Sequence, residues 1–359
     1  MRPRADAPSA RACGICASVT ASATDVVTTP AAVLDFQFDT EYPCHFCTPR
    51  RVTHMRSQFH APDASARYAG RGAASPAVSV IRLQSNALAA SHEDLMEPAY
   101  FSRYEQLAMR RDENGILEVR LHTRGGPCLF GPRTHEHMVD AFYDISRDAD
   151  TRLVILTGTG NSWIAAFDAS QATAKDDFTV PRNWDRVYWE GKKVLQNLLD
   201  IDVPMIAAVN GPALVHSEYI LTCDIVVASS NVVFQDLPHL AFGLVPGDGV
   251  HVLWPHVLGP VRGRYFLATQ QKIAASEALR LGVVNEVLEP DALMPRAWAL
   301  ARQLAALPTL TLRYMRVATA QRLKELVVRE VGHGLALQGL SGAALGNPGP
   351  DPRPQDIRR

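Results

Sequence analysis

The chain has 359 residues, a formal net charge of −1 and 47% hydrophobic residues, enough for a sizeable core in one large domain or two smaller ones. This near-neutral balance excludes a global field for nucleic acid or for an anionic membrane surface. No uninterrupted apolar run approaches 18 residues, so the sequence predicts no membrane span. The first residues lack an apolar signal segment and only loosely fit a transit peptide, which favours a cytoplasmic location.

Four of the six cysteines form two C-x-x-C pairs, at Cys13 and Cys16 and at Cys44 and Cys47. Such pairs can bind zinc. The stretch between them has no evident compact knuckle, so an unstructured segment with chance thiols is the preferred interpretation. A disulfide scaffold is less favoured still.

Composition divides the chain near residue 96. Residues 1–95 are rich in Ala, Ser, Arg and Pro and include "APDASARYAGRGAASPA", which predicts a disordered extension or a wrongly assigned start. We expect a core domain over 96–290 and a helical region over 291–345. The polar, proline-rich residues 346–359 predict a disordered tail.

From residue 96 onward, apolar strand patterns alternate with amphipathic helix patterns. The expected elements, in chain order, are a hairpin over 107–123 turning at Asn114-Gly115, a helix over 134–148 capped by Thr134, a buried strand over 151–160, a helix over 183–201, a buried strand over 203–214, a short helix over 218–224, strand–turn–strand over 225–235, helix, short helix and strand over 262–288, and helices from Met294 to about Ala344. Near-continuous apolar strands of this kind predict an α/β fold with parallel pairing and outer helices. No G-x-G-x-x-G or P-loop is present, so no nucleotide cofactor is predicted.

Several motifs carry a resemblance to a known family. The stretches "AAVNGPAL", "CDI", "GLVPG" and "LGVVNEV" are similar to those of the crotonase (enoyl-CoA hydratase/isomerase) superfamily, over roughly residues 100–340. The resemblance implies a core of ββα repeats arranged as a spiral, followed by a C-terminal helical trimerisation region. It also implies homotrimers, which can pair into hexamers.

Within that superfamily, "VILTGTG", "FQDLPH" and "VPGDGVHVLWPHVLG" most resemble the β-diketone hydrolases of the 6-oxocamphor hydrolase type. These enzymes have the crotonase fold but do not use coenzyme A. The resemblance implies hydrolysis of a carbon–carbon bond in a cyclic or bicyclic β-diketone by a retro-Claisen reaction, giving a keto acid without a cofactor.

The resemblance assigns catalytic roles to three residues. His239 would activate water as a base titrating near neutral pH, Asp248 would fix its tautomer, and His216 would donate to the enolate oxygen. The imidazolium of His239, or Asp248 after it takes up a proton, would then protonate the enolate carbon. The substrate-binding candidates are His135, Phe130, Trp163, Ala165, Glu218 and Gln338. Phe130 and Gln338 replace a tryptophan and a glutamate of the family, so we expect a pocket of altered shape and polarity.

Other interpretations stay open at this point. His239 can be a packed histidine and Asp248 a turn residue; Trp163, Phe130 and Trp184 can be aromatic core. The runner-up function is an enoyl-CoA hydratase or isomerase that acts on an acyl-CoA thioester, and a third is a non-catalytic interaction module. A metal site from His239, Asp248 and His251 is disfavoured, because their spacing fits no standard ligand pattern.

Overall fold

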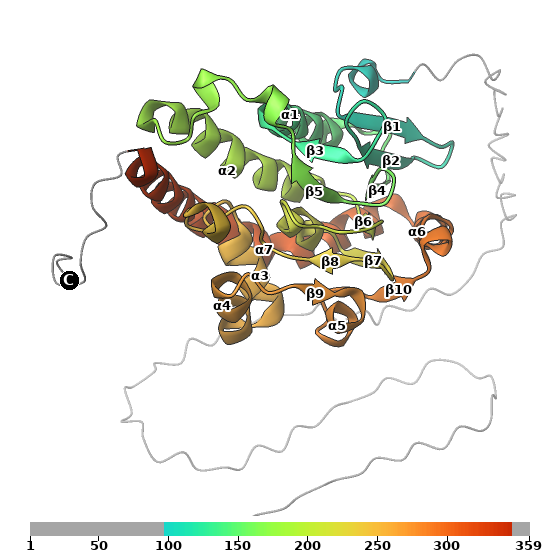
Figure 1. Cartoon of the computed structure of the whole chain (residues 1–359). Helices are drawn as coiled ribbons and strands as arrows, with labels where there is room; N and C mark the ends of the chain where they lie inside the picture. Colours follow the sequence, from blue (N-terminus) through green and yellow to red (C-terminus); the bar gives the residue numbers. More distant parts are fainter. Residues whose placement is uncertain (1–96, 347–359) are drawn as a thin grey trace, which may run out of the picture. The chain divides into compact units, whose positions relative to one another are not determined.

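The computed structural model describes residues 97–346 and shows the predicted alternation of strands and helices (Figure 1). The extension predicted at 1–95, its two C-x-x-C pairs and the tail after residue 346 lie outside the described residues. Within residues 97–346, no helix combines the length and apolar character that crossing a membrane requires.

A six-stranded sheet in the order β1-β2-β4-β6-β7-β10 forms the centre of the fold. Its strands are β1 Leu107–Arg111, β2 Ile116–Leu121, β4 Leu153–Gly158, β6 Met205–Val209, β7 Ile225–Ser229 and β10 Glu286–Leu288. Only β1 and β2 pair antiparallel; the other neighbours are parallel. The hairpin prediction is confirmed, and Gly115 takes a positive φ of 78° where an added Cβ would lie 2.7 Å from the Asp150 carbonyl oxygen.

A smaller sheet lies beside the first. It contains the parallel pair β3 Cys128–Phe130 and β5 Ile164–Phe167 and the antiparallel pair β8 Val233–Phe234 and β9 Ile273–Ala274. Ala213 joins the two strand pairs, because it forms one isolated β-bridge with Ile164 and another with Phe234. The sequence did not reveal β3, β5 or β9, because strands of two to four residues are too short to show a period.

The helices are α1 Pro132–Arg147, α2 Trp184–Asp200, α3 Val250–Leu258, α4 Pro260–Ala268, α5 Ala275–Arg280, α6 Pro290–Ala305 and α7 Thr309–Gly346. The prediction that Thr134 caps α1 is wrong, since Gly131 is the N-cap and Pro132 begins the helix. Proline suits that position because the first turn does not use its amide. The Thr134 hydroxyl donates instead to the Leu129 carbonyl oxygen at 3.1 Å.

Both faces of the main sheet are covered. On one face, Ile155 and Ile206 pack against Leu293 and Ala297 of α6. On the other face, α1, α2 and α3 enclose the larger core. Strands β4 and β6 are buried along their whole length, which explains why they read as unbroken apolar runs.

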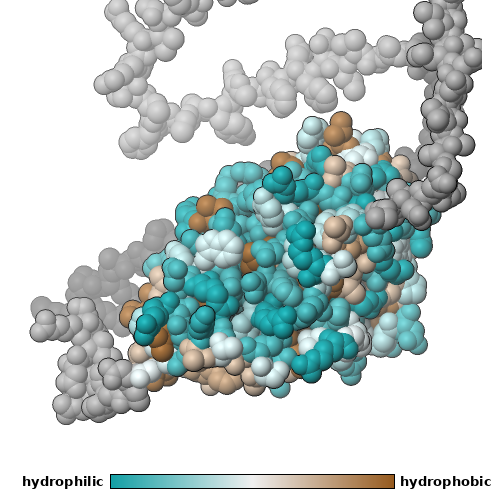
Figure 2. All heavy atoms as spheres, turned by 90° about the horizontal axis from the view of Figure 1, so that it is seen from above, coloured by the Kyte–Doolittle hydropathy of each residue, from teal (hydrophilic) through white to brown (hydrophobic). Residues whose placement is uncertain are grey.

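Helix α7 spans 38 residues and packs along α2 and α3. Arg316 fixes its first half, because the buried guanidinium donates to the carbonyl oxygens of Ile201 and Thr222 and pairs with Asp224 at 3.0 Å. Figure 2 shows a largely hydrophilic face of the molecule, with apolar side chains at scattered positions. The second half of α7 reaches the cavity described next.

Candidate active site

A cavity of about 450 Å³ lies between α1, α2 and α7, within the range of small-molecule sites. Most of its wall is apolar. The aromatic and leucine side chains in the lining are Phe130, Phe167, Phe178, Trp184, Phe242, Leu244 and Leu335. The ionisable lining side chains are His135, Asp168, Asp176, Arg186, Glu190, His216, His239 and Asp248.

His239 enters the cavity from the turn before the short 3-10 helix η6, Leu240–Phe242. Its ring lies between two carboxylates: Nδ1 is 2.6 Å from Asp236 Oδ1, and Nε2 is 3.1 Å from Asp248 Oδ2. Burial disfavours the imidazolium, but the charges of Asp248 and Asp236 outweigh it and hold the pKa of His239 well above its usual value.

Asp248 lies in the P-G-D-G turn directly before α3. Gly249 after it has a φ of 122°, which favours glycine. At Gly247 before it, a Cβ would lie 2.2 Å from the Gly334 carbonyl oxygen of α7, so the two backbones meet with no room for a side chain. Burial raises the pKa of Asp248, yet the charge of His239 and its hydrogen bond outweigh it, so that pKa is well below the usual range.

His216 follows β6 in the "NGPALVHSE" loop, immediately before the 3-10 helix η5, Ser217–Thr222. It adopts the left-handed conformation (φ 48°, ψ 44°), which is uncommon for a residue other than glycine and is often found at functional sites. Its Nδ1 is 2.7 Å from the fully buried Glu218 Oε1 and 3.8 Å from Asp248 Oδ2. Burial lowers the pKa of His216, but Glu218 and Asp248 outweigh it and raise that pKa.

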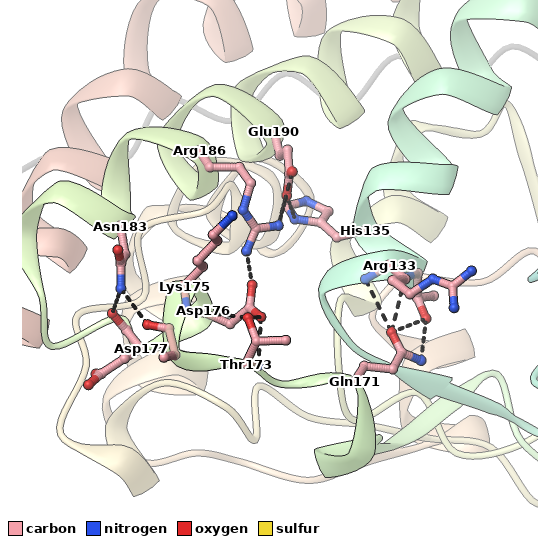
Figure 3. Close-up of polar contacts among 12 residues, drawn as sticks. Arg133, His135, Gln171, Thr173, Lys175, Asp176, Asp177, Asn183, Arg186 and Glu190 are labelled. Carbon is pink, nitrogen blue, oxygen red and sulfur yellow. Dashed lines mark hydrogen bonds and ion pairs between the residues drawn. The ribbon is translucent and has the colours of Figure 1, made fainter.

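A second histidine–carboxylate pair comes from α1 and α2. Nδ1 of His135 lies 3.1 Å from Glu190 Oε2. Arg186 Nη1 donates to Glu190 Oε1 at 3.2 Å, and Arg186 Nη2 pairs with Asp176 in the segment before α2. Figure 3 shows these four side chains in sequence, from the segment through α2 to α1. Burial lowers the pKa of His135 despite the opposing effect of Glu190.

The structure brings most of the predicted site residues together. His135, His216, His239, Asp248, Phe130 and Gln338 all line the cavity. The Phe130 ring centroid is 4.2 Å from that of His216, and Glu218 reaches the site through His216. The other two predicted residues, Trp163 and Ala165, are not among the described residues that line the cavity. Trp163 is fully buried in the hydrophobic core.

Five charged side chains at the site were not predicted: Asp168, Asp176, Arg186, Glu190 and Asp236. Asp236 stands three residues before His239 in "FQDLPH", close enough to share one turn. Glu190 lies on the buried face of α2 together with Val194. A charge among apolar residues on one helix face was the available signal, since buried charges occur almost only when paired.

His216, Glu218 and Asp248 also have ligand-type atoms within 4.8 Å of one another. The 2.7 Å separation of His216 and Glu218 is a hydrogen-bond length. His251, which the disfavoured metal interpretation included, lies 3.4 Å from the Glu330 carbonyl oxygen. The arrangement therefore fits proton transfer and hydrogen bonding to a small polar substrate.

Comparison with known proteins places the fold and the site in context. The sequence profile of the enoyl-CoA hydratase/isomerase family matches residues 111–333. The chain is 60% identical to a β-diketone hydrolase from the cyanobacterium Anabaena, whose structure contains bound (S)-3-oxocyclohexyl acetic acid; the match has a TM-score of 0.69 and covers 70% of this chain and 100% of that one. This agreement confirms the predicted crotonase-like fold.

Curated relatives are more distant. A short-chain-enoyl-CoA hydratase from Clostridium acetobutylicum is 36% identical over 165 residues, which are 45% of this chain and 61% of that protein. The fatty acid oxidation complex subunit alpha of Idiomarina loihiensis is 31% identical over 207 residues, 56% of this chain and 28% of that protein. The chain thus spans less than two thirds of both relatives. Because the family profile matches more than half of the chain, the chain belongs to the enoyl-CoA hydratase/isomerase family of the crotonase superfamily.

Proposed function

We propose that the protein hydrolyses a carbon–carbon bond of a cyclic or bicyclic β-diketone to give a keto acid. The observation that carries the proposal is the cavity itself, in which three histidines, each beside a carboxylate, face an apolar wall. Such a wall suits a carbocyclic ring, and the polar groups suit its two carbonyls. The 60% identity to a β-diketone hydrolase supports the same assignment.

The reaction needs two proton transfers. Water attacks one carbonyl carbon and loses a proton, the adduct expels an enolate as the carbon–carbon bond breaks, and the enolate carbon then takes up a proton. In the proposal, His216 donates to the enolate oxygen, because Glu218 and Asp248 raise its pKa and so favour the protonated ring. No metal or coenzyme takes part in this scheme.

His239 supplies the second proton in this proposal. The sequence suggested that it accepts the proton of water, with Asp248 as its orienting partner. Because carboxylates flank both ring nitrogens, the imidazolium is the stable form and is suited to donate. Asp236 and Asp248 then hold the ring in place.

A paired assay on the full chain tests the function. One arm offers a symmetric bicyclic 1,3-diketone and follows loss of its ultraviolet absorbance and formation of the keto acid; the other offers crotonyl-CoA and follows hydration. We expect turnover only in the first arm, and we expect His239→Gln to reduce kcat by at least about 100-fold, as removal of a proton-transfer group does. Turnover of crotonyl-CoA alone contradicts the proposal and favours the hydratase function of the curated relatives.

A further inference from the structure

Two histidines that line the cavity, His239 and His135, differ in what their rings can do. A neutral imidazole accepts a proton only through a ring nitrogen that carries a free lone pair. In His239, Nδ1 and Nε2 both lie within hydrogen-bond distance of a carboxylate, which favours a proton on each. That ring is arranged as a proton donor, so another group must accept the proton of water.

His135 has the complementary arrangement. Its Nδ1 faces Glu190 Oε2 at 3.1 Å, while its Nε2 has no hydrogen-bond partner among residues 97–346. Since a carboxylate can only accept, Nδ1 carries the ring proton and Nε2 keeps the lone pair. The residue is 7% exposed and lines the cavity.

Glu190 is itself held in position. It is 4% exposed, and Arg186 Nη1 donates to its Oε1 at 3.2 Å and to its Oε2 at 3.4 Å, so Oε2 faces both Arg186 and His135 (Figure 3). Arg186 is held in turn by Asp176. A carboxylate fixed behind a histidine sets its tautomer and stabilises the imidazolium that forms during proton transfer.

The charged groups around His135 come from several elements. Glu190 and Arg186 lie on α2, His216 precedes η5, and Asp248 precedes α3. Burial disfavours the charged ring, and His216 opposes it further, whereas Glu190 and Asp248 favour it. The net result lowers the pKa of His135, so the ring is neutral at pH 7 and ready to accept a proton.

We propose that His135, oriented by Glu190, is the general base that takes the proton from the attacking water, while His239 returns a proton to the enolate carbon. This assignment rests on the proposed β-diketone hydrolysis. The water oxygen bonds to the carbonyl carbon and one water proton moves to His135 Nε2. The bond between the two carbons breaks, its electron pair forms the enolate, and the His239 proton is transferred to carbon. His135 then releases one proton to solvent and His239 takes one up, so the overall change is diketone plus water to keto acid.

Kinetics of the full-length protein test the assignment. For His135→Gln we expect kcat to fall by at least about 100-fold, with little change in KM and with loss of the acidic limb of the pH–kcat profile. For Glu190→Gln, loss of the carboxylate lowers the pKa of His135, so the acidic limb moves to lower pH. His137→Gln on the same helix is the matched control and should retain the wild-type profile. An intact acidic limb in His135→Gln, with a raised KM alone, overturns the proposal.

A second measurement does not depend on turnover. Nuclear magnetic resonance of 15N-histidine-labelled protein, with His135 assigned by comparison with His135→Gln, should show the Nδ1–H tautomer and a pKa below that of free histidine. Glu190→Gln should lower that pKa further. An Nε2–H tautomer for His135 overturns the proposal. If the tautomer is as expected but the wild-type protein cleaves no diketone, the proposed function is wrong. The assignment of His135 as the base of that reaction is then wrong as well.

Discussion

At the residue scale, five buried ionisable groups alternate acid and base in one row of contacts: Asp236, His239, Asp248, His216 and Glu218. Charges so close together and so far buried shift one another's pKa strongly. The carboxylates therefore decide which histidine is charged, and each can be tested by a substitution that keeps the shape of the side chain.

Asp236→Asn is the first such substitution. Asp236 raises the pKa of His239, so its neutral analogue lowers that pKa and fewer rings are charged above neutral pH. If charged His239 is the proton donor, the basic limb of the pH–kcat profile moves to lower pH and kcat at pH 8 falls. Profiles of both proteins on the same diketone provide the measurement. A basic limb that stays in place contradicts the role of His239 as donor.

The sequence could predict the histidines of this site because each stands in a recognisable stretch, His239 in "FQDLPH" and His216 after "NGP". It could not predict their partners equally well. Glu190 stands 55 positions from His135, and only the packing of α1 on α2 brings them together. The position of Glu190 among apolar residues indicates a buried, paired charge, but no local sequence signal identifies a partner so far along the chain.

At the element scale, the position of Asp248 depends on how closely α7 approaches the P-G-D-G turn. The sequence identifies the turn and predicts helices after Met294, but a backbone contact between them follows only from the fold. A Cβ at Gly334 would lie 2.1 Å from His251 Cε1 and 2.5 Å from the Gly247 carbonyl oxygen. Small residues at both positions are therefore needed to seat the helix.

Gly334→Ala should push α7 away from this turn. We expect a loss of about 1–3 kcal/mol in the free energy of unfolding, typical of overpacking, and a lower kcat because Asp248 is displaced from His239. Urea denaturation and the diketone assay measure the two effects. Gly332→Ala is the matched control in the same helix, since its Cβ would meet mainly the ends of the Tyr188 and Lys192 side chains. Equal stability of the two variants would contradict the close-packing argument.

The 168–183 segment between β5 and α2 forms another part of the cavity wall, through Asp168, Asp176 and Phe178. Asp176 ties it to α2 through Arg186. Asp176→Asn weakens this tie, so we expect faster hydrogen exchange in the segment and a KM several times higher, with a small effect on global stability. Asp177→Asn changes a neighbouring carboxylate that accepts hydrogen bonds only from Thr179, and it serves as the control. Unchanged exchange in Asp176→Asn would exclude the anchoring role.

At the scale of the whole molecule, α7 carries an exposed apolar stripe at helical spacing, formed by Leu310, Tyr314 and Val317. The family resemblance predicts homotrimers or hexamers through the C-terminal helices. We expect sedimentation velocity to show an oligomer for the wild-type protein and dissociation for Tyr314→Glu, which places a charge in the stripe. Tyr314→Phe keeps the apolar surface and should remain associated. A wild-type monomer at micromolar concentration would contradict the prediction.

All the groups assigned to catalysis lie between Phe130 and Gln338, within the described residues 97–346. The Anabaena hydrolase is matched over its whole length by 70% of this chain, so a chain of that size contains a complete copy of the shared fold. We therefore expect a protein spanning Met96 to Arg359 to keep the kcat and KM of the full chain on a bicyclic diketone. Parallel assays, with circular dichroism to verify folding, provide the comparison. A folded but inactive truncated protein would show that residues 1–95 contribute directly to the site, and the assignment of the cavity wall would then have to include them.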